Sequence, residues 1–413
     1  MSEQSLFTEA LVPEAPADSH YGLRAEFQAD SHPDKVNLVI GAYKDDEGKP
    51  WVLPVVKKAA QFYHEDKNQN NEYLPISGEP AFCKAAAQVL LGSDLDYQSR
   101  ISSFQTISGT GAVHLGAVFL SKFMSEPKPS VYLSNPTWDN HVPVFNHAGL
   151  SIKHYPYYAQ KTKSLDFDAM VETLAAAPRG SIVLLQACAH NPTGLDPTPE
   201  QWRKIATVVQ EANLFPFFDC AYQGFATADL ANDSFPIRHF ASLGLEMFIA
   251  QSFSKNLGLY GQRTGCLHFL SRSGPDASST TKRVASQLAK LQRCEISTPA
   301  AYGAKIASLV LNNEKLAKEW IDDLATMSDR IKKMRAALQG HLERLQTPGS
   351  FEHITAQIGM FAYTGLSVDQ ILLMRSKWHV YMLDTGRMSV SGLNTGNVEY
   401  VARAIDDVVR STG

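Results

Sequence analysis

Short apolar runs alternate with amphipathic segments along most of the chain. Mostly apolar runs of four to six residues lie at 104–107, 130–133, 181–186, 214–218, 247–250 and 266–270. Helices are expected before, between and after these runs: apolar spacing predicts them at 54–66 and 397–410, a further helix is predicted at 112–123, and segments rich in Lys, Glu and Met predict helices at about 311–346. Buried strands that alternate with helices predict an α/β fold with a mostly parallel sheet. Further short strands are expected at 36–43, 359–363 and 386–392.

Small, polar or ionic residues follow four of the predicted strands. They lie near Ser108, Asn191, Asp219 and Lys255. In an open parallel sheet, ligands bind at the edge formed by the carboxyl ends of the strands. The pattern therefore predicts one ligand site, assembled from segments that are far apart in the sequence.

Lys255 lies where the buried run 247–250 gives way to a turn rich in glycine. A lysine at the mouth of a buried sheet loses hydration, which lowers its pKa and frees the amine to act as a nucleophile or base. Ser252, Ser254 and Arg263 could seat a phosphate beside that amine. An amine next to a phosphate seat suits pyridoxal phosphate, which has an aldehyde and a phosphate. For a lone lysine, a solvated surface position is the commoner alternative.

A second anion site is predicted at Ser108-Gly109-Thr110-Gly111, between a strand and a helix. Free backbone N–H groups and the positive end of the helix dipole meet at such a junction. The Gly-x-Gly spacing also suggests a dinucleotide fingerprint, but that motif needs a third glycine where this chain has His114. The segment fits a phosphate cup and does not fit a dinucleotide fold.

Together with the turn Asn191-Pro192-Thr193-Gly194, these segments resemble the aspartate aminotransferases of the class I, fold-type I pyridoxal phosphate family. The similarity extends from about residue 23 to 409, and the sequences of several segments look most like those of the fungal cytosolic enzymes. It implies a large domain with a mostly parallel seven-stranded sheet flanked by helices, plus a smaller α+β domain. The expected division is an N-terminal arm with part of the small domain (1–47), the large cofactor domain (48–322) and the small C-terminal domain (323–413).

The resemblance implies catalytic and ring-binding roles for the strand ends. Lys255 would hold the cofactor as a Schiff base and move the substrate's alpha proton. Asp219 would keep the pyridine nitrogen protonated, Tyr222 and Asn191 would bind the phenolic oxygen, and Trp138 would stack on the ring. The implied reaction exchanges the amino group between L-aspartate and 2-oxoglutarate. Aromatic or kynurenine transamination by the same class stays open as an alternative.

The family match also names the phosphate and substrate contacts. The phosphate would be bound by Ser108, Gly109, Thr110, Ser252, Ser254, Arg263 and, from the other subunit of a homodimer, Tyr73. Arg387 would bind the alpha-carboxylate of the substrate, and Arg293 of the partner subunit would bind its side-chain carboxylate. The other substrate contacts would be Trp138, Asn191, Ile40 and Gly41.

Three residues depart from the family pattern. Gln186 stands where many relatives have a histidine behind the aspartate, and Thr298 and Ala300 replace the usual residues near Arg293. These departures leave the reaction intact and bear on fine specificity. His141 is expected to support the ring-binding residues from behind.

Composition narrows the remaining possibilities. A net charge of −4 provides no basic face for nucleic acid or membranes, and the five cysteines show no metal-ligand spacing. The N-terminal segment is acidic and lacks an apolar core, which favours a cytosolic protein over a mitochondrial or secreted one. A non-catalytic binding protein on the same fold would be expected to lack Lys255, Asp219 or Arg387, and all three are present.

Overall fold

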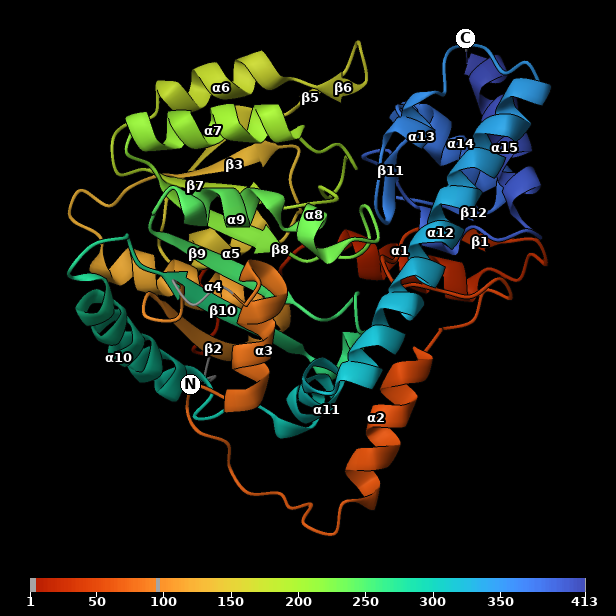
Figure 1. Cartoon of the computed structure of the whole chain (residues 1–413). Coiled ribbons are helices and arrows are strands. Elements are labelled where there is room, and N and C mark those ends of the chain that lie inside the picture. The colour runs from red at the N-terminus through yellow and green to blue at the C-terminus, as the bar shows by residue number, and fades with distance from the viewer. Residues whose placement is uncertain (1–4, 94–96, 413) are drawn as a thin grey trace.

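A seven-stranded sheet forms the centre of the larger part of the molecule (Figure 1). The computed structural model describes residues 5–93 and 97–412. The strand order is β2-β10-β9-β8-β7-β3-β4. The strands are β2 (Ile101–Ile107), β3 (Val131–Asn135), β4 (Ile152–Pro156), β7 (Ile182–Gln186), β8 (Phe215–Cys220), β9 (Met247–Ser252) and β10 (Thr264–Leu270).

All neighbouring strands of this sheet are parallel except at β10, which runs antiparallel to both β9 and β2. A short connection suffices between β9 and β10, and that connection carries Lys255 and Arg263. The predicted mostly parallel, seven-stranded fold is confirmed. The strand that contains Asp219 extends through that residue, whereas the sequence predicted that the strand would end at 218.

Alternate residues of the central strands pack into two separate apolar layers. In β7, Val183 and Leu185 pack into one layer, while Ile182 and Leu184 pack into the other. This period-2 alternation is expected of a strand covered on both faces. Helices α3 (Pro80–Leu91), α6 (Phe167–Ala175), α7 (Pro199–Glu211) and α9 (Phe235–Ser242) contribute to the first layer. Helices α4 (Ser108–Phe123), α5 (His141–His147) and α10 (Ala277–Glu295) contribute to the second.

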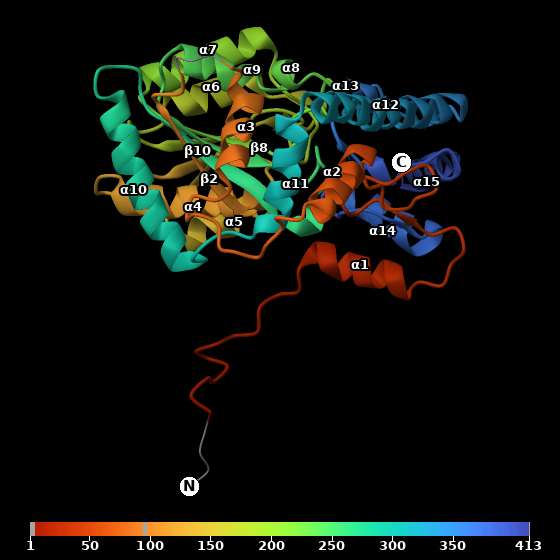
Figure 2. The ribbon, with the colours of Figure 1, turned by 60° about the horizontal axis from the view of Figure 1, so that its bottom comes forward.

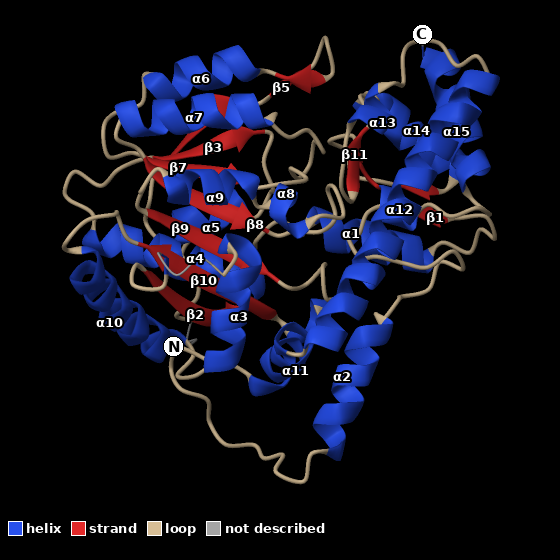
Figure 3. Cartoon of the chain, in the orientation of Figure 1, coloured by secondary structure: helices blue, strands red, loops and turns tan. Residues whose placement is uncertain are grey.

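The smaller part of the molecule lies beside the sheet and is built mainly of helices (Figure 3). Its longest helix, α12 (Glu314–Arg344), packs against α15 (Val398–Thr412). Two short two-stranded sheets complete it: β1 (Val36–Asn37) with β12 (Val380–Tyr381), and β11 (Phe361–Tyr363) with β13 (Arg387–Ser389). The predicted boundary at 322/323 falls inside α12, which continues without interruption across it.

Helix α1 (Ser19–Ala29) joins the N-terminal segment to the smaller part. Leu23 packs there against Val39, Tyr381 and Leu383, and residues 5–18 extend away from the body (Figure 2). The remaining elements are α2 (Pro54–Glu65), α8 (Leu230–Asp233), α11 (Ala301–Asn312), α13 (His353–Ala356), α14 (Val368–Trp378), β5 (Tyr158–Ala159) and β6 (Ser164–Leu165).

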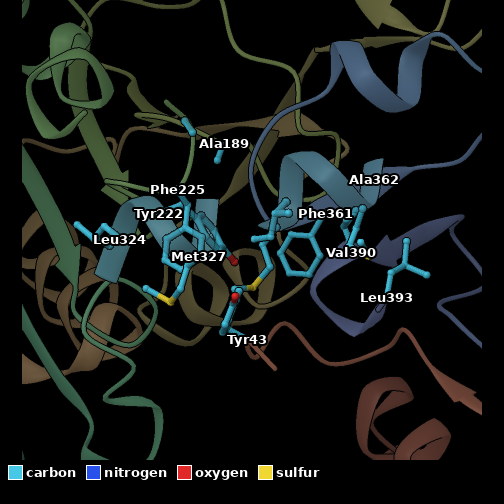
Figure 4. Packing of buried hydrophobic residues seen from close by; sticks show 14 of the residues in the cluster. Tyr43, Ala189, Tyr222, Phe225, Leu324, Met327, Phe361, Ala362, Val390 and Leu393 are labelled. Atoms are coloured by element: carbon cyan, nitrogen blue, oxygen red, sulfur yellow. The ribbon is translucent and has the colours of Figure 1, made fainter. Parts of the chain in front are cut away.

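An apolar cluster joins the two parts (Figure 4). Tyr222 and Phe225 of the larger part lie close to Met327 of α12 and to Phe361 and Val390 of the smaller part. Because Tyr222 is also a predicted site residue, this cluster anchors the site between the two parts.

Two expectations about individual elements were wrong. The apolar stretch 36–43 forms only a two-residue strand, because β12 offers a partner for Val36 and Asn37 alone. The helix predicted at 112–123 already begins at Ser108, so the phosphate-cup residues lie in its first turn.

Three general features of the described residues bear on function. No helix in 5–93 or 97–412 is both long and apolar enough to cross a bilayer. Within the same ranges, no group of three or more His, Cys, Asp or Glu residues is arranged to hold a metal ion. The five cysteines are unpaired, and only Cys294 is exposed.

Candidate active site

The predicted strand ends meet around one cavity of about 210 Å³. Eleven of the predicted site residues line it: Ser108, Gly109, Thr110, Trp138, Asn191, Asp219, Tyr222, Ser252, Ser254, Lys255 and Arg263. They come from β8, β9, the first turn of α4 and the segments that follow β3, β7, β8 and β9. A cavity at the carboxyl edge of a parallel sheet is the usual ligand position in this fold class.

One end of the cavity is built to receive an anion. The side-chain oxygen of Ser108 lies 2.7 Å from that of Ser254 and 3.2 Å from that of Ser252. The N–H of Ser108 donates to the carbonyl of Arg263 at 3.0 Å. Among the described residues no side chain caps the N-terminus of α4, so the next N–H groups, of Gly109 and Thr110, can bind a ligand. A Cβ added at Gly109 would lie 3.0 Å from the Cβ of Ser252, so a larger residue would crowd this end. The guanidinium of Arg263 adds a positive charge to the same cavity.

Lys255 projects its amine into the same cavity. The amine lies 5.1 Å from the centre of the Tyr222 ring. Burial lowers the pKa of Lys255 to about 8, the carboxylate of Asp219 raises it in part, and the charges of Arg263 and Arg387 lower it further. A larger fraction of the amine is therefore uncharged near neutral pH than in an exposed lysine, as a nucleophilic or basic lysine requires.

Asp219 is buried and held from behind by His141. Its carboxylate lies 3.0 Å from Nε2 of His141, whose Nδ1 lies 2.8 Å from the hydroxyl of Thr137. The chain of contacts fixes the carboxylate at the floor of the cavity. The supporting role expected for His141 is thus a direct hydrogen bond to Asp219, formed across 78 residues of sequence.

Arg387 lies beside the cavity with one unsatisfied donor. The side chain is only 3% exposed, and its two terminal nitrogens donate to the carbonyl of Val39 at 2.8 Å and to Oδ1 of Asn191 at 3.4 Å. The guanidinium lies over the Phe361 ring at 4.3 Å. Its Nε has no hydrogen-bond partner among the described residues. A buried guanidinium with a spare donor is suited to bind a carboxylate.

The sequence and the fold both match known aminotransferases. Residues 33–405 match the family Aminotransferase class I and II. The chain belongs to this family. The cytoplasmic aspartate aminotransferase of Saccharomyces cerevisiae is 47% identical over 404 residues, which cover 96% of this chain and 95% of that protein.

Solved structures agree with this assignment. The structure of aspartate aminotransferase from the Saccharomyces cerevisiae cytoplasm has a TM-score of 0.95 at 46% identity, covering 98% of this chain and 99% of that one. An aromatic-amino-acid aminotransferase from Burkholderia pseudomallei, solved covalently bound to pyridoxal phosphate, has a TM-score of 0.93 at 38% identity. The match covers 98% of this aminotransferase and all of that chain.

Of the predicted site residues of the aminotransferase that do not line the cavity, Tyr73 and Arg293 are exposed. Tyr73 is 87% exposed, and Arg293 is exposed near the C-terminal end of α10, where it bonds to the hydroxyl of Ser297. Tyr73 lines a separate cavity of about 800 Å³, which Arg263 also lines. Neither residue meets Lys255 within one chain, so their roles stay predictions that depend on a second subunit.

The predicted contacts at Ile40 and Gly41 lie on the Arg387 side of the site. Neither residue lines the central cavity, but the preceding residue, Val39, accepts a hydrogen bond from Arg387. A Cβ at Gly41 would lie 2.5 Å from the ring of Phe361, which itself lies under the Arg387 guanidinium. Gly41 therefore allows the close packing that positions Arg387.

Gln186 has a function that the sequence did not reveal. It lines the cavity, pairs with Asp219 across β7 and β8, and brackets the backbone of Asn191. Its amide nitrogen donates to the Asn191 carbonyl at 2.9 Å, and its amide oxygen accepts from the Asn191 N–H at 2.8 Å. Gln186 and Asn191 are five residues apart, a spacing that allows the chain after β7 to turn back on the end of the strand. This spacing was the only sign of the contact in the sequence.

Proposed function

We propose that this aminotransferase moves an amino group reversibly between L-aspartate and 2-oxoglutarate, giving oxaloacetate and L-glutamate. The observation that carries the proposal is the cavity that places Lys255 between a phosphate cup and Asp219, with Arg387 beside it. The relatives of matching length, named as cytoplasmic aspartate aminotransferases, support both the substrate pair and a cytoplasmic location.

Pyridoxal 5′-phosphate is the cofactor that the cavity fits. Its phosphate would be held by Arg263, the first turn of α4 and the hydroxyls of Ser108, Ser252 and Ser254, and its ring by Trp138 and Asp219. The uncapped α4 terminus is an independent sign of an anion at this position. When bound, the cofactor supplies an aldehyde for the amine of Lys255 and a ring that accepts electrons from the substrate's alpha carbon.

Lys255 and Asp219 then divide the acid–base work. The lowered pKa of Lys255 lets the amine accept the alpha proton and return it on the cofactor side. Asp219, oriented by His141, would keep the ring nitrogen of the bound cofactor protonated and so favour electron withdrawal from the substrate. Tyr222 and Asn191 would bind the phenolic oxygen and so orient the ring relative to Lys255.

Arg387 is proposed to bind the alpha-carboxylate of the substrate. We expect Arg387→Lys to lower kcat/KM for aspartate about a hundredfold, because lysine cannot form the bidentate pair and leaves the Asn191 and Val39 oxygens without their donor. Steady-state kinetics with aspartate and 2-oxoglutarate measure the effect. Arg375→Lys, at an arginine paired with Asp384 on the surface, serves as the control. Equal losses in the two variants would contradict the assignment.

A homodimer is proposed to complete the site with Tyr73 and Arg293 of a second subunit. Both are exposed in one chain, and the cavity lined by Tyr73 shares Arg263 with the cofactor site. Arg293 would there bind the side-chain carboxylate of aspartate. Thr298 and Ala300 line the same second cavity, so these departures from the family pattern lie where a partner would bind.

Subunit exchange tests the shared site. Lys255→Ala and Arg293→Ala proteins, each nearly inactive with aspartate, are mixed at equal concentration and allowed to exchange. Half of the dimers become hybrids, and one site of each hybrid is intact, so about a quarter of all sites should recover aspartate activity. Mixing Lys255→Ala with Asp219→Ala is the control, because both residues serve the same chain's site. No recovery despite exchange verified by mass would reject the shared site.

An aromatic or kynurenine aminotransferase is the second candidate. The similarity to the Burkholderia pseudomallei enzyme, named for aromatic amino acids, keeps it open. A panel of amino donors with 2-oxoglutarate separates the two. The proposal expects aspartate to have the highest kcat/KM, and a higher value for phenylalanine, tyrosine or kynurenine would replace it with the alternative.

A further inference from the structure

Asp196 is a partly buried carboxylate that holds the segment leading to Asn191. Its two oxygens accept backbone N–H groups separately: Oδ2 from Ala189 at 2.6 Å and Oδ1 from His190 at 2.9 Å. Ala189 has φ of +49°, a left-handed conformation that is unfavourable for a residue with a Cβ. The carboxylate therefore stabilises a strained backbone two residues before Asn191.

Asp233 holds the segment that follows Tyr222 in the same way. Its Oδ2 accepts the backbone N–H groups of Gly224 at 2.7 Å and Ala226 at 3.2 Å. Its Oδ1 accepts the N–H of Thr227 at 3.0 Å and the hydroxyl of Thr227 at 2.6 Å. The side chain is only 2% exposed, so these donors replace its hydration.

The two carboxylates line one cavity of about 100 Å³, which shares no lining residue with the cofactor cavity. In the part of the chain that the structure describes, neither forms an ion pair. Burying an unpaired carboxylate is costly, fully so for Asp233 and in part for the half-buried Asp196. A pair of them, each bonded to the backbone of a neighbouring site segment, indicates a role beyond the stability of the fold.

We propose that Asp196 and Asp233 are positioning residues that hold Asn191 and Tyr222 in place for the phenolic oxygen of the cofactor. This inference rests on the proposed function, because it explains how Asn191 and Tyr222, which the cofactor would contact, are held in place. It is independent of the substrate. Asp196 acts on Asn191 together with Gln186, which brackets the same residue from the strand side.

The coupling of the two carboxylates adds a pH signature. Burial and the charge of Asp233 raise the pKa of Asp196 to about 6, while its two backbone donors lower it in part. The other titratable groups that face Asp196 are His190, Tyr157 and Cys188. Burial lowers the pKa of His190 well below its usual value and raises that of Tyr157, and the hydrogen bond with Cys220, together with burial, raises that of Cys188, so none of the three gains or loses a proton near pH 6. Below pH 6 a protonated Asp196 has one acceptor fewer for Ala189 and His190, so the grip on this segment weakens.

Hydrogen exchange of the cofactor-free protein provides the first test. Asp196→Asn keeps one oxygen and turns the other acceptor into a donor, so amides in residues 187–194 should exchange about tenfold faster. Asp233→Asn should do the same for residues 222–227. Asp229→Asn is the matched control: Asp229 accepts the N–H groups of Ala231 and Asn232 through one oxygen, which asparagine retains.

Binding of pyridoxal phosphate provides the second test. In Asp196→Asn the dissociation constant should rise about tenfold at pH 7.5, the loss expected for one charge-assisted hydrogen bond. Between about pH 7 and 5 the wild-type constant should rise toward that of the variant, so that the ratio of the two falls toward one. A loss of general stability would keep that ratio constant.

The outcomes separate the inference from the proposed function. Unchanged exchange and cofactor binding in both Asp196→Asn and Asp233→Asn would overturn the positioning role, as would equal changes in Asp229→Asn. Wild-type protein that binds no pyridoxal phosphate would overturn the proposed function and, with it, the purpose assigned here. Faster exchange confined to the two segments, together with the converging pH curves, supports the inference.

Discussion

Lys255→Ala is expected to lower kcat with aspartate by more than about 10⁴-fold, because it removes a nucleophile and a proton carrier together. Each role alone is typically worth about 10²–10⁴-fold. The pKa of about 8 places the amine within reach of both roles near neutral pH. Single-turnover and steady-state rates with aspartate and 2-oxoglutarate measure the loss.

The same variant should retain cofactor binding, because the phosphate end of the cavity is separate from the amine. Ser108, Ser252, Ser254 and Arg263 are unchanged in it. Lys122→Ala is the matched control, since Lys122 also lies near an aromatic ring, at 5.7 Å from Phe123, but at the other end of α4. A Lys255→Ala protein that transaminates near the wild-type rate would refute the assignment of the site.

The location of the site could be predicted from the sequence because it depends on a simple topological rule. Carboxyl ends of parallel strands meet at one edge, so residues near Ser108, Asn191, Asp219 and Lys255 had to come together once the strands were recognised. The cavity lined by all four confirms that expectation. Local composition sufficed here, because the polar residues interrupt otherwise apolar runs.

Contacts that support the site were harder to predict. The hydrogen bond from His141 to Asp219 joins β8 to the segment after β3, and β7 lies between these strands in the sheet. No sequence pattern indicates that these two residues, 78 positions apart, are in contact. The bonds of Asp196 and Asp233 are local in sequence, yet the sequence gives no sign that Asp233, at the end of α8, will be buried or that Asp196 will be partly covered.

Strand lengths were also hard to predict, because they depend on the partner. The apolar stretch 36–43 has enough β-forming residues for a longer strand, but only two of them find a neighbour in β12. Tyr73 and Arg293 show the same limit between chains. The sequence shows that Tyr73 and Arg293 are present, but only the family resemblance suggests which groups of a second subunit they contact.

Asp219→Ala should lower the rate of alpha-proton removal about 10³-fold, because the ring nitrogen would lose the carboxylate that keeps it protonated. Aspartate binding should stay nearly unchanged. A tenfold change in rate corresponds to about 1.4 kcal/mol in the activation barrier. The carboxylate lines the cavity, whereas Arg387, proposed to bind the substrate, lies beside the cavity and keeps its contacts with Asn191 and Val39. Replacement of the alpha hydrogen of aspartate by deuterium should give a larger isotope effect on kcat than in wild type, because proton removal becomes fully rate-limiting.

A second readout of Asp219→Ala needs no turnover. The Asp219 carboxylate raises the pKa of Lys255 against the effect of burial, so its removal should lower that pKa below about 8. Titration of Lys255 in the cofactor-free protein, followed by the pH dependence of its chemical labelling, should shift to lower pH. Glu246→Ala is the control, because Glu246 is a partly buried carboxylate just before β9, at the other end of the strand from Lys255.

The rate measurement decides the role of Asp219. If the Asp219→Ala rate stays within about threefold of wild type, the carboxylate does not keep the ring nitrogen protonated, and the role assigned to it in electron withdrawal is wrong.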